Sequence, residues 1–343
     1  MAKTVILTCI AAAALLCAPS VRAADKVPAP TAADREWRLP AVIMPRDNAS
    51  TPARVALGQA LFFDPRLSGN GASSCASCHN PSLGWSDAQK TAIGFGGVVL
   101  ARATPTILNT AYNTQFMWDG RKKSLEDQAL GPMKAPDEMN TDFPSVIARL
   151  GALPAYRAMF DKAYHGEPIG EETLAKAIAA YERTVVSRDA PFDRWLAGDT
   201  RAITPQQYRG WKVFTDPARG NCSTCHSGPN FTDNGFHNIG IRGAAANPDL
   251  GRFNIRKVAS MKGAFKTPTL RDIELTGPYF RDGSAATLRD VVEHYARGGE
   301  DRSNLSPDMK KLDLSEQDKS DLVAFMKALT GRRVAVVAPQ LPQ

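Results

Sequence analysis

Apolar residues recur along most of the chain at the three- and four-residue spacing of helices. This spacing predicts helices over residues 52–64, 124–133, 145–164, 171–187, 205–214 and 315–331, and another that begins at Thr287. Thr51 precedes Pro52, and Thr287 and Ser315 each precede an aspartate three positions on, which is typical of helix starts. Alternation with a period of two residues is almost absent. The fold class is therefore expected to be mainly α, with long irregular loops.

The first 23 residues follow a different pattern. Lys3 precedes an apolar run from Val5 to Ala18, and small residues surround the segment's end at Ala23. The run is shorter than the ~20 residues that span a bilayer. We therefore expect residues 1–23 to be a signal peptide that is cleaved near Ala23. The mature protein would then be exported to the periplasm, with no stable membrane insertion.

The charge balance gives little support to a nucleic-acid partner. The chain has 42 Lys and Arg against 35 Asp and Glu, a net charge of +7, which falls to about +5 once Lys3 and Arg22 leave with the signal. No dense run of basic residues accompanies this excess, so no nucleic-acid binding is expected.

The pattern Cys-x-x-Cys-His occurs twice, at residues 75–79 and 222–226. In c-type haem attachment the two thiols bond to the haem and the histidine binds the iron. A redox dithiol or half of a zinc site is the alternative for Cys-x-x-Cys, but a histidine directly after both pairs favours haem. We therefore expect two covalently bound c-type haems, attached through Cys75, Cys78 and His79 and through Cys222, Cys225 and His226.

The sequence around the two motifs is also repeated. Residues 58–65, which end in Asp-Pro, correspond to residues 210–217, and Trp85-Ser86-Asp87 is echoed by Phe231-Thr232-Asp233. Internal similarity of this kind indicates a duplicated unit, and a length of 343 residues suits two domains. We expect two cytochrome c-like haem domains, 24–200 and 201–343, with residues 188–204 as the linker.

Several further motifs resemble those of the bacterial di-haem cytochrome c peroxidase family, including its MauG branch, over about residues 50–331. They are the two haem motifs, Phe116-Met117-Trp118-Asp119-Gly120-Arg121 with Gln128 and Glu138, and residues 267–271 followed by 277–283. The resemblance implies that hydrogen peroxide reacts at the N-terminal haem. It also implies that a six-coordinate C-terminal haem passes electrons.

The resemblance assigns roles to three residues near the haems. Glu138 would be the distal acid/base, because cleavage of the O–O bond requires a proton to move between the two oxygens. Gln128 would be its neighbour in the pocket, and Trp118 would carry electrons between the haems. The structural alternatives are a solvated loop acid for Glu138 and core packing for Trp118.

Tyr295 stands where the peroxidase branch has the methionine that is the sixth ligand of the C-terminal haem. MauG-like members have tyrosine there, and a phenolate favours ferric and higher oxidation states of iron. We expect Tyr295 to be the sixth ligand of this haem iron, with a core tyrosine as the alternative. The adjacent His294 is expected to face solvent.

Three other positions depart from the family pattern. Residues 91–102 contain no histidine, although many relatives close the first haem with a loop histidine, so this iron is expected to be open at rest. Ala103 replaces an asparagine that binds calcium in relatives. A calcium ion would therefore need backbone carbonyls and water. Arg281 stands where many relatives have histidine, and the sequence alone does not explain this change.

The expected function is therefore reduction of hydrogen peroxide to water, with electrons from a small redox protein such as a cytochrome c or a cupredoxin. One alternative is a MauG-like enzyme that oxidises side chains of a partner protein through a high-valent iron state. An alternative of another class is a non-enzymatic electron-transfer cytochrome in which both irons are six-coordinate.

Overall fold

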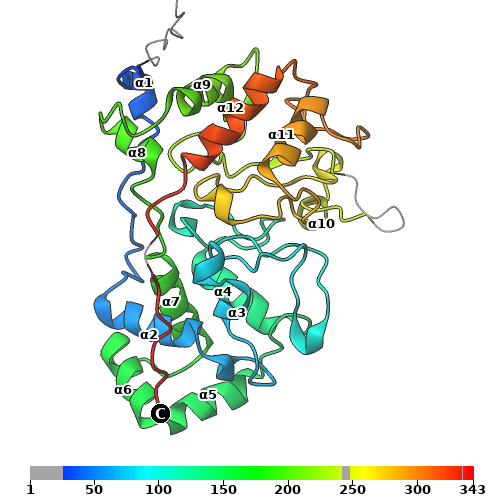
Figure 1. The fold of residues 1–343 in the computed structure, drawn as a ribbon. Helices are drawn as coiled ribbons and strands as arrows, with labels where there is room; N and C mark the ends of the chain where they lie inside the picture. The colour runs from blue at the N-terminus through cyan, green and yellow to red at the C-terminus, as the bar shows by residue number, and fades with distance from the viewer. Residues whose placement is uncertain (1–25, 242–247, 334) are drawn as a thin grey trace, which may run out of the picture.

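The computed structural model describes residues 26–241, 248–333 and 335–343 (Figure 1); the expected signal peptide lies outside these residues. The described chain is mainly helical, as predicted, and no helix in it is long and apolar enough to cross a membrane. The α-helices are α1 (Ala32–Arg35), α2 (Pro52–Phe62), α3 (Cys75–Cys78), α4 (Leu125–Lys134), α5 (Phe143–Ala152), α6 (Pro154–Ala163), α7 (Glu171–Glu182), α8 (Pro191–Leu196), α9 (Pro205–Thr215), α10 (Phe253–Arg256), α11 (Leu288–Arg297) and α12 (Glu316–Lys327). Strands β1 (Phe236–His237) and β2 (Phe265–Lys266) pair antiparallel.

The predicted helix caps are confirmed. The side chains of Thr51, Thr287 and Ser315 each accept a hydrogen bond from a backbone N–H three residues on. The predicted single helix over 145–164 is wrong: it is divided into α5 and α6, because Pro154 disfavours helical backbone at the residue before it.

Two lobes with matching helices form the molecule. Figure 1 shows α2 and α4–α7 in one lobe and α8, α9, α11 and α12 in the other. The first core contains Leu57 and Leu61 of α2 and Ile178 of α7, and the second contains Trp211 of α9 and Phe325 of α12. Each lobe thus buries its own apolar cluster, as a duplicated unit would.

A glycine allows the central helix pair of each lobe to pack closely. A Cβ atom added to Gly58 of α2 would lie 1.9 Å from the carbonyl oxygen of Ala177 in α7. One added to Gly210 of α9 would lie 1.9 Å from the carbonyl oxygen of Asp321 in α12. The same crossing therefore recurs in both lobes, at positions that the sequence repeat aligns.

The correspondence extends to α4 and α11. Each helix has ten residues, and each follows a turn that is closed by an isolated antiparallel β-bridge. The residue directly after the start of the bridge has positive φ in both turns: Met117 before α4 and Phe280 before α11. The two segments align without a gap. At equivalent positions, Pro132 of α4 corresponds to Tyr295 of α11, and Trp118 corresponds to Arg281.

Both ends of the described chain cross between the lobes (Figure 1). Near the N-terminus, Trp37 packs edge-on against Trp211 at 5.0 Å, and Asp34 accepts a hydrogen bond from the Trp211 indole. At the other end, Val336 packs against the first core, and Arg66 donates to the carbonyl oxygen of Pro342.

The segment 188–204, expected as a linker, contains α8. Phe192, Trp195 and Leu196 of this helix are fully buried in the second core. This stretch therefore packs as part of the second lobe.

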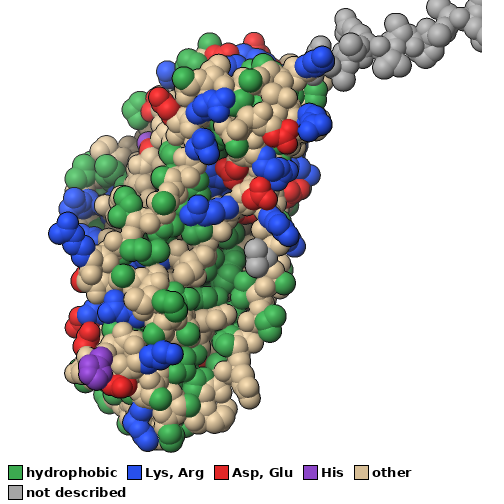
Figure 2. Space-filling view, turned by 90° about the vertical axis from the view of Figure 1, so that its left-hand side faces the viewer, with side chains coloured by type: hydrophobic (Ala, Val, Ile, Leu, Met, Phe, Trp, Pro, Cys, Tyr) green, Lys and Arg blue, Asp and Glu red, His purple; other side chains and the backbone are tan. Residues whose placement is uncertain are grey.

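On the face shown in Figure 2, basic side chains are scattered among acidic and apolar ones.

The Gly58→Ala variant should lose ~1–3 kcal/mol of unfolding free energy, because its new methyl group forces α2 away from α7. Gly151 of α5 is the matched control, since a Cβ there meets nothing within 4 Å. Gly151→Ala should be neutral or stabilise by up to ~1 kcal/mol. Thermal unfolding of the haem-loaded proteins measures both, and equal stability of the two variants would contradict this packing.

Candidate functional site

The histidines of both haem motifs are held by the same hydrogen bond. Nδ1 of His79 donates to the carbonyl oxygen of Trp85 at 3.2 Å, and Nδ1 of His226 donates to that of Phe231 at 3.1 Å. Trp85 and Phe231 both have positive φ, at 60° and 52°. Because Nδ1 carries the proton, Nε2 of each ring is the nitrogen left to bind a metal.

The residue after each of these aromatics makes a second matching contact. The Ser86 hydroxyl donates to the carbonyl oxygen of Thr104 at 2.8 Å, and the Thr232 hydroxyl donates to that of Thr267 at 2.7 Å. The similarity between residues 85–87 and 231–233 therefore corresponds to a repeated three-dimensional frame around each histidine.

The protonation states of these groups suit haem. Burial lowers the pKa of His79 and brings that of His226 to about 4, so both rings are neutral, as an iron ligand must be. Burial also raises the pKa of the Cys78 thiol to about 11 and that of Cys222 to about 12. Neutral thiols do not suit a reactive dithiol, which needs a thiolate, but they are compatible with thioether bonds.

One continuous cavity brings most of the predicted site residues together. It is lined by His79, Trp118, Gln128, Cys222, Cys225, His226 and Tyr295. Cys75, Cys78 and Glu138 are not among the lining residues. The two neutral imidazoles, each next to a pair of thiols that forms no disulfide, fit the donor set of c-type haem. Residues 75–79 and 222–226 are therefore the segments that would hold the two haems.

Glu138 lies near the first motif, in a turn that folds back on the end of α4. The backbone N–H of Met139 donates to the carbonyl oxygen of Pro132, and that of Glu138 donates to Ala135. Burial raises the pKa of Glu138, although the charge of Arg121 opposes this shift. The Glu138 carboxylate in turn helps to raise the pKa of Cys78, which indicates that the two side chains are close.

Trp118 lies where the two lobes meet. Its indole N–H donates to the carbonyl oxygen of Ala103 at 2.9 Å, and its own carbonyl oxygen accepts from the backbone N–H of Lys266 at 2.8 Å. Trp118 therefore contacts both lobes while lining the shared cavity. Gln128 reaches the same cavity from α4.

Tyr295 lines the cavity from α11. Burial, together with the charges of Cys225 and Cys222, raises the pKa of its phenol, so the side chain is close to the second motif. The ring also lies 6.4 Å from that of Phe280. Its equivalent in the first lobe, Pro132, has no side-chain atom that could bind iron.

The expectation that His294 faces solvent is wrong. Only 3% of this residue is exposed, and its Nε2 lies 2.7 Å from the carbonyl oxygen of Ile239. The reason is that the segment containing Ile239 packs over this face of α11, which covers a position that an isolated helix would expose. His294 is therefore engaged with the backbone.

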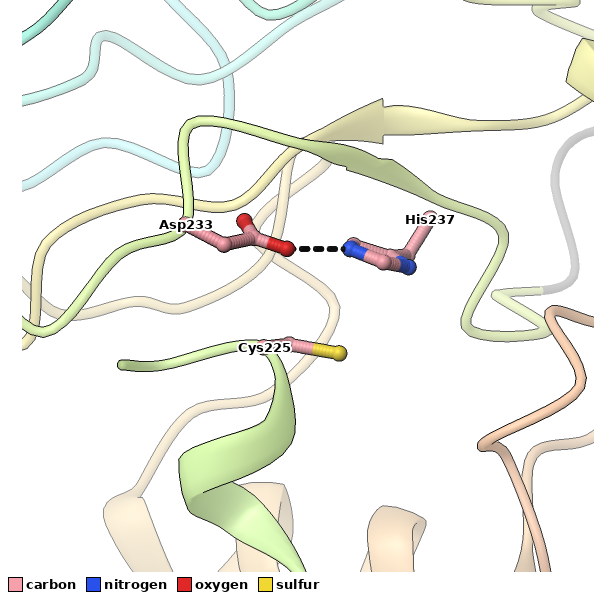
Figure 3. A group of neighbouring side chains, drawn as sticks. All are labelled: Cys225, Asp233 and His237. Carbon is pink, nitrogen blue, oxygen red and sulfur yellow. Dashed lines mark hydrogen bonds and ion pairs between the residues drawn. The ribbon is translucent and has the colours of Figure 1, made fainter. Parts of the chain in front are cut away.

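Cys225, Asp233 and His237 form a compact group beside the second motif (Figure 3). Their potential ligand atoms lie within 4.8 Å of one another, but Cys225 is a haem-attachment residue. Nε2 of His237 contacts Asp233 at 2.7 Å, and this bond raises the pKa of His237 to about 10 and lowers that of Asp233 to about 2. We interpret the group as an ion pair that supports the second haem segment.

Sequence analysis did not identify Glu182, at the end of α7. This residue lines the cavity and is 3% exposed, and its Oε2 has no hydrogen-bond partner among the residues that the structure describes. Burial raises its pKa to about 8, so the carboxyl is protonated at neutral pH. The helical spacing could have indicated its burial, because Glu182 lies one turn after Ile178 on the apolar face of α7.

A duplicated helical fold with two partly buried His-and-thiol motifs, whose histidines line one cavity, is typical of a di-haem c-type oxidoreductase. Residues 52–201 match the sequence model of the family described as di-haem cytochrome c peroxidase. The chain is also 50% identical to the methylamine utilization protein MauG of Methylorubrum extorquens, over 87% of this chain and 84% of that protein. It is 38% identical to cytochrome-c peroxidase IdrP1 of Denitromonas iodatirespirans, over 85% of each.

A solved structure supports membership in the same family. A MauG-like protein associated with microbial copper homeostasis superimposes with a TM-score of 0.80 at 33% identity, over 86% of this chain and 95% of that one. The chain belongs to the di-haem cytochrome c peroxidase and MauG family, and it is an oxidoreductase with two c-type haems. Membership in a family of enzymes does not favour the non-enzymatic cytochrome.

The raised pKa of Glu182 predicts a pH-dependent loss of stability. Between its ordinary pKa of 4.5 and about 8, the carboxyl is protonated in the folded protein and ionised in the unfolded chain. The folded state therefore loses up to roughly 1.4 kcal/mol per pH unit as pH rises through this window. Glu182→Gln removes this loss, so the variant should gain stability relative to wild type from pH 5 to 8.

Glu172→Gln provides the control, because this side chain is 78% exposed on the same helix. Denaturant unfolding of the haem-loaded proteins at several pH values measures the difference. Parallel pH profiles for wild type and Glu182→Gln would show that Glu182 is not held protonated.

Proposed function

We propose that this protein reduces hydrogen peroxide to water at its first haem site and receives electrons through its second. The observation that carries the proposal is the difference between equivalent positions of α4 and α11: Tyr295 of α11 lines the cavity, and its equivalent on α4 is Pro132. Only the second site has a side chain there that can act as a sixth ligand. The haem irons, held by His79 and His226, would supply the redox chemistry for O–O cleavage.

Glu138 is proposed as the group that moves the proton. Its half-buried carboxyl has a raised pKa, which makes proton uptake and release easier near neutral pH. It would take a proton from one peroxide oxygen and deliver it to the other, which then leaves as water. Gln128, on the cavity wall, would orient the peroxide through its amide. The overall change consumes two electrons and two protons and gives two waters.

Trp118 is proposed as the electron relay between the two sites. This proposal is supported by its position at the junction, where it is hydrogen-bonded to Ala103 on one side and to Lys266 on the other, and by the cavity that it lines together with His79 and His226. Tyr295 would bind the second iron through its phenolate oxygen. A bound metal ion would favour the ionised form that burial alone disfavours.

A MauG-like activity is the second candidate, supported by Tyr295 and by the 50% identity to MauG. In that case, the electrons would come from side chains of a partner protein, and not from a small cytochrome c or cupredoxin. Rapid peroxide turnover with a reduced small redox protein supports the first candidate. Oxidation of a protein partner, without such turnover, supports the second.

The remaining parts of the proposal concern organisation and location. We propose haem domains at residues 24–200 and 201–343, with α8 packed on the second, and a periplasmic enzyme whose signal 1–23 has been removed.

A calcium ion, which the family resemblance implies, would lack the asparagine ligand. The Ala103 carbonyl oxygen that stands there already accepts the Trp118 indole N–H.

Glu138→Gln should slow the reaction with peroxide by ~10²–10⁴-fold, because the amide cannot carry the proton. Asp137→Asn, the exposed neighbour, should react at the wild-type rate. Stopped-flow absorbance of the oxidised proteins with peroxide measures both rates, and unchanged resting spectra show that the haem sites are intact. A Glu138→Gln rate within twofold of wild type would exclude the proposed proton transfer.

Tyr295→Met should raise the midpoint potential of the second haem, because a neutral thioether replaces an anionic oxygen ligand. Spectroelectrochemical titration measures the potential of each haem, and that of the first should change little. Oxidised wild-type protein should also show one high-spin and one low-spin haem by electron paramagnetic resonance. If the second potential does not move, Tyr295 is not the ligand.

A further inference from the structure

The two lobes meet through a reciprocal pair of backbone hydrogen bonds. The N–H of Ala103 donates to the carbonyl oxygen of Arg281 at 2.6 Å, and the N–H of Lys266 donates to that of Trp118 at 2.8 Å. Ala103 and Lys266 are equivalent residues of the two lobes, as are Trp118 and Arg281. The second lobe thus has cations at both positions where the first has neutral side chains.

Both cations line the shared cavity, together with the haem-binding histidines. Lys266 is only 7% exposed, and its Nζ donates to the carbonyl oxygen of Thr267 at 2.9 Å. Arg281 is partly buried, with its guanidinium 4.4 Å above the ring of Phe265. In the described part of the chain, neither side chain has a carboxylate within ion-pair distance.

Unlike Lys266 and Arg281, two other arginines of the protein have carboxylate partners. Arg102 pairs with Asp119 and Asp249, and Arg271 pairs with Asp193. The acid that acts on Lys266 through space is Asp233, which is already paired with His237. A buried cation without an anionic partner is costly, so the cavity requires negative charge from another source.

We infer that Lys266 and Arg281 bind the propionate carboxylates of the haems where the two lobes meet. Lysine and arginine form strong, charge-assisted hydrogen bonds to carboxylates. The c-type haem is covalently attached through its vinyl groups, which leaves its propionates free to act as anionic partners. The carboxylate of Asp308 also lines the cavity, but it is not within ion-pair distance of Lys266 or Arg281 in the described part of the chain. Burial lowers the pKa of Lys266 to about 8, and a neighbouring carboxylate would keep the ammonium charged.

The inference rests on the presence of two haems and not on the proposed peroxide chemistry. Its test can therefore fail or succeed independently of catalysis.

The test uses Lys266→Met and Arg281→Gln in the haem-loaded protein, with Lys262→Met, an exposed lysine near β2, as the matched control. Loss of a cation beside a propionate should lower the midpoint potential of the nearer haem, because the more positive oxidised state is no longer disfavoured. It should also shift the pH-dependent part of that potential to higher pH. The control variant should match wild type, and Lys266→Arg should restore the wild-type potential.

Resonance Raman spectroscopy gives a second readout, because the propionate bending modes respond to their hydrogen-bond partners. These modes should shift in Arg281→Gln even if Lys266→Met does not fold with two haems. Unchanged potentials and propionate modes in the folded variants would overturn the inference.

Discussion

The structure depends on how a partly buried histidine is fixed beside its pair of thiols. An imidazole can bind iron through Nε2 only if Nδ1 holds the proton, and a carbonyl oxygen five or six residues on enforces this in each lobe. That carbonyl belongs to an aromatic residue, Trp85 or Phe231. It reaches the histidine ring because this residue has a left-handed backbone conformation. The rest of each lobe, from the glycine-mediated helix crossing to the hydroxyl contact at Ser86 or Thr232, holds this turn in place.

On this repeated frame, function depends on where the two copies differ. Pro132 of one copy stands where the other has Tyr295, the proposed sixth ligand. Ala103 and Trp118 are hydrogen-bonded to Arg281 and Lys266 across the junction, so the proposed relay belongs to one lobe and the two cations belong to the other. Glu182 of α7 corresponds to Met326 of α12, so a carboxyl in one copy is replaced by a thioether in the other. A few side chains therefore give two similar haem sites different chemistry.

The sequence predicted the parts of the fold that local rules determine. The haem motifs, the caps at Thr51, Thr287 and Ser315 and the repeat around Trp85 and Phe231 could be identified because each depends on residues close in sequence. His294, Glu182 and α8 could not be placed correctly, since their burial depends on distant segments that cover them. The proximity of Glu138 to Cys78 and the reciprocal bonds at Ala103 and Lys266 likewise arise only from tertiary packing. The roles of Glu138, Gln128, Trp118 and Tyr295 remain proposals.

The crossed ends of the chain have a consequence for biosynthesis. Trp37 is made early but packs on Trp211, and the segment containing Pro342 is made last but returns to Arg66 in the first lobe. The contact of Pro342 with the first lobe can therefore form only after the second half of the chain has been synthesised. Division of the gene between the lobes would leave each half without a segment that the other supplies.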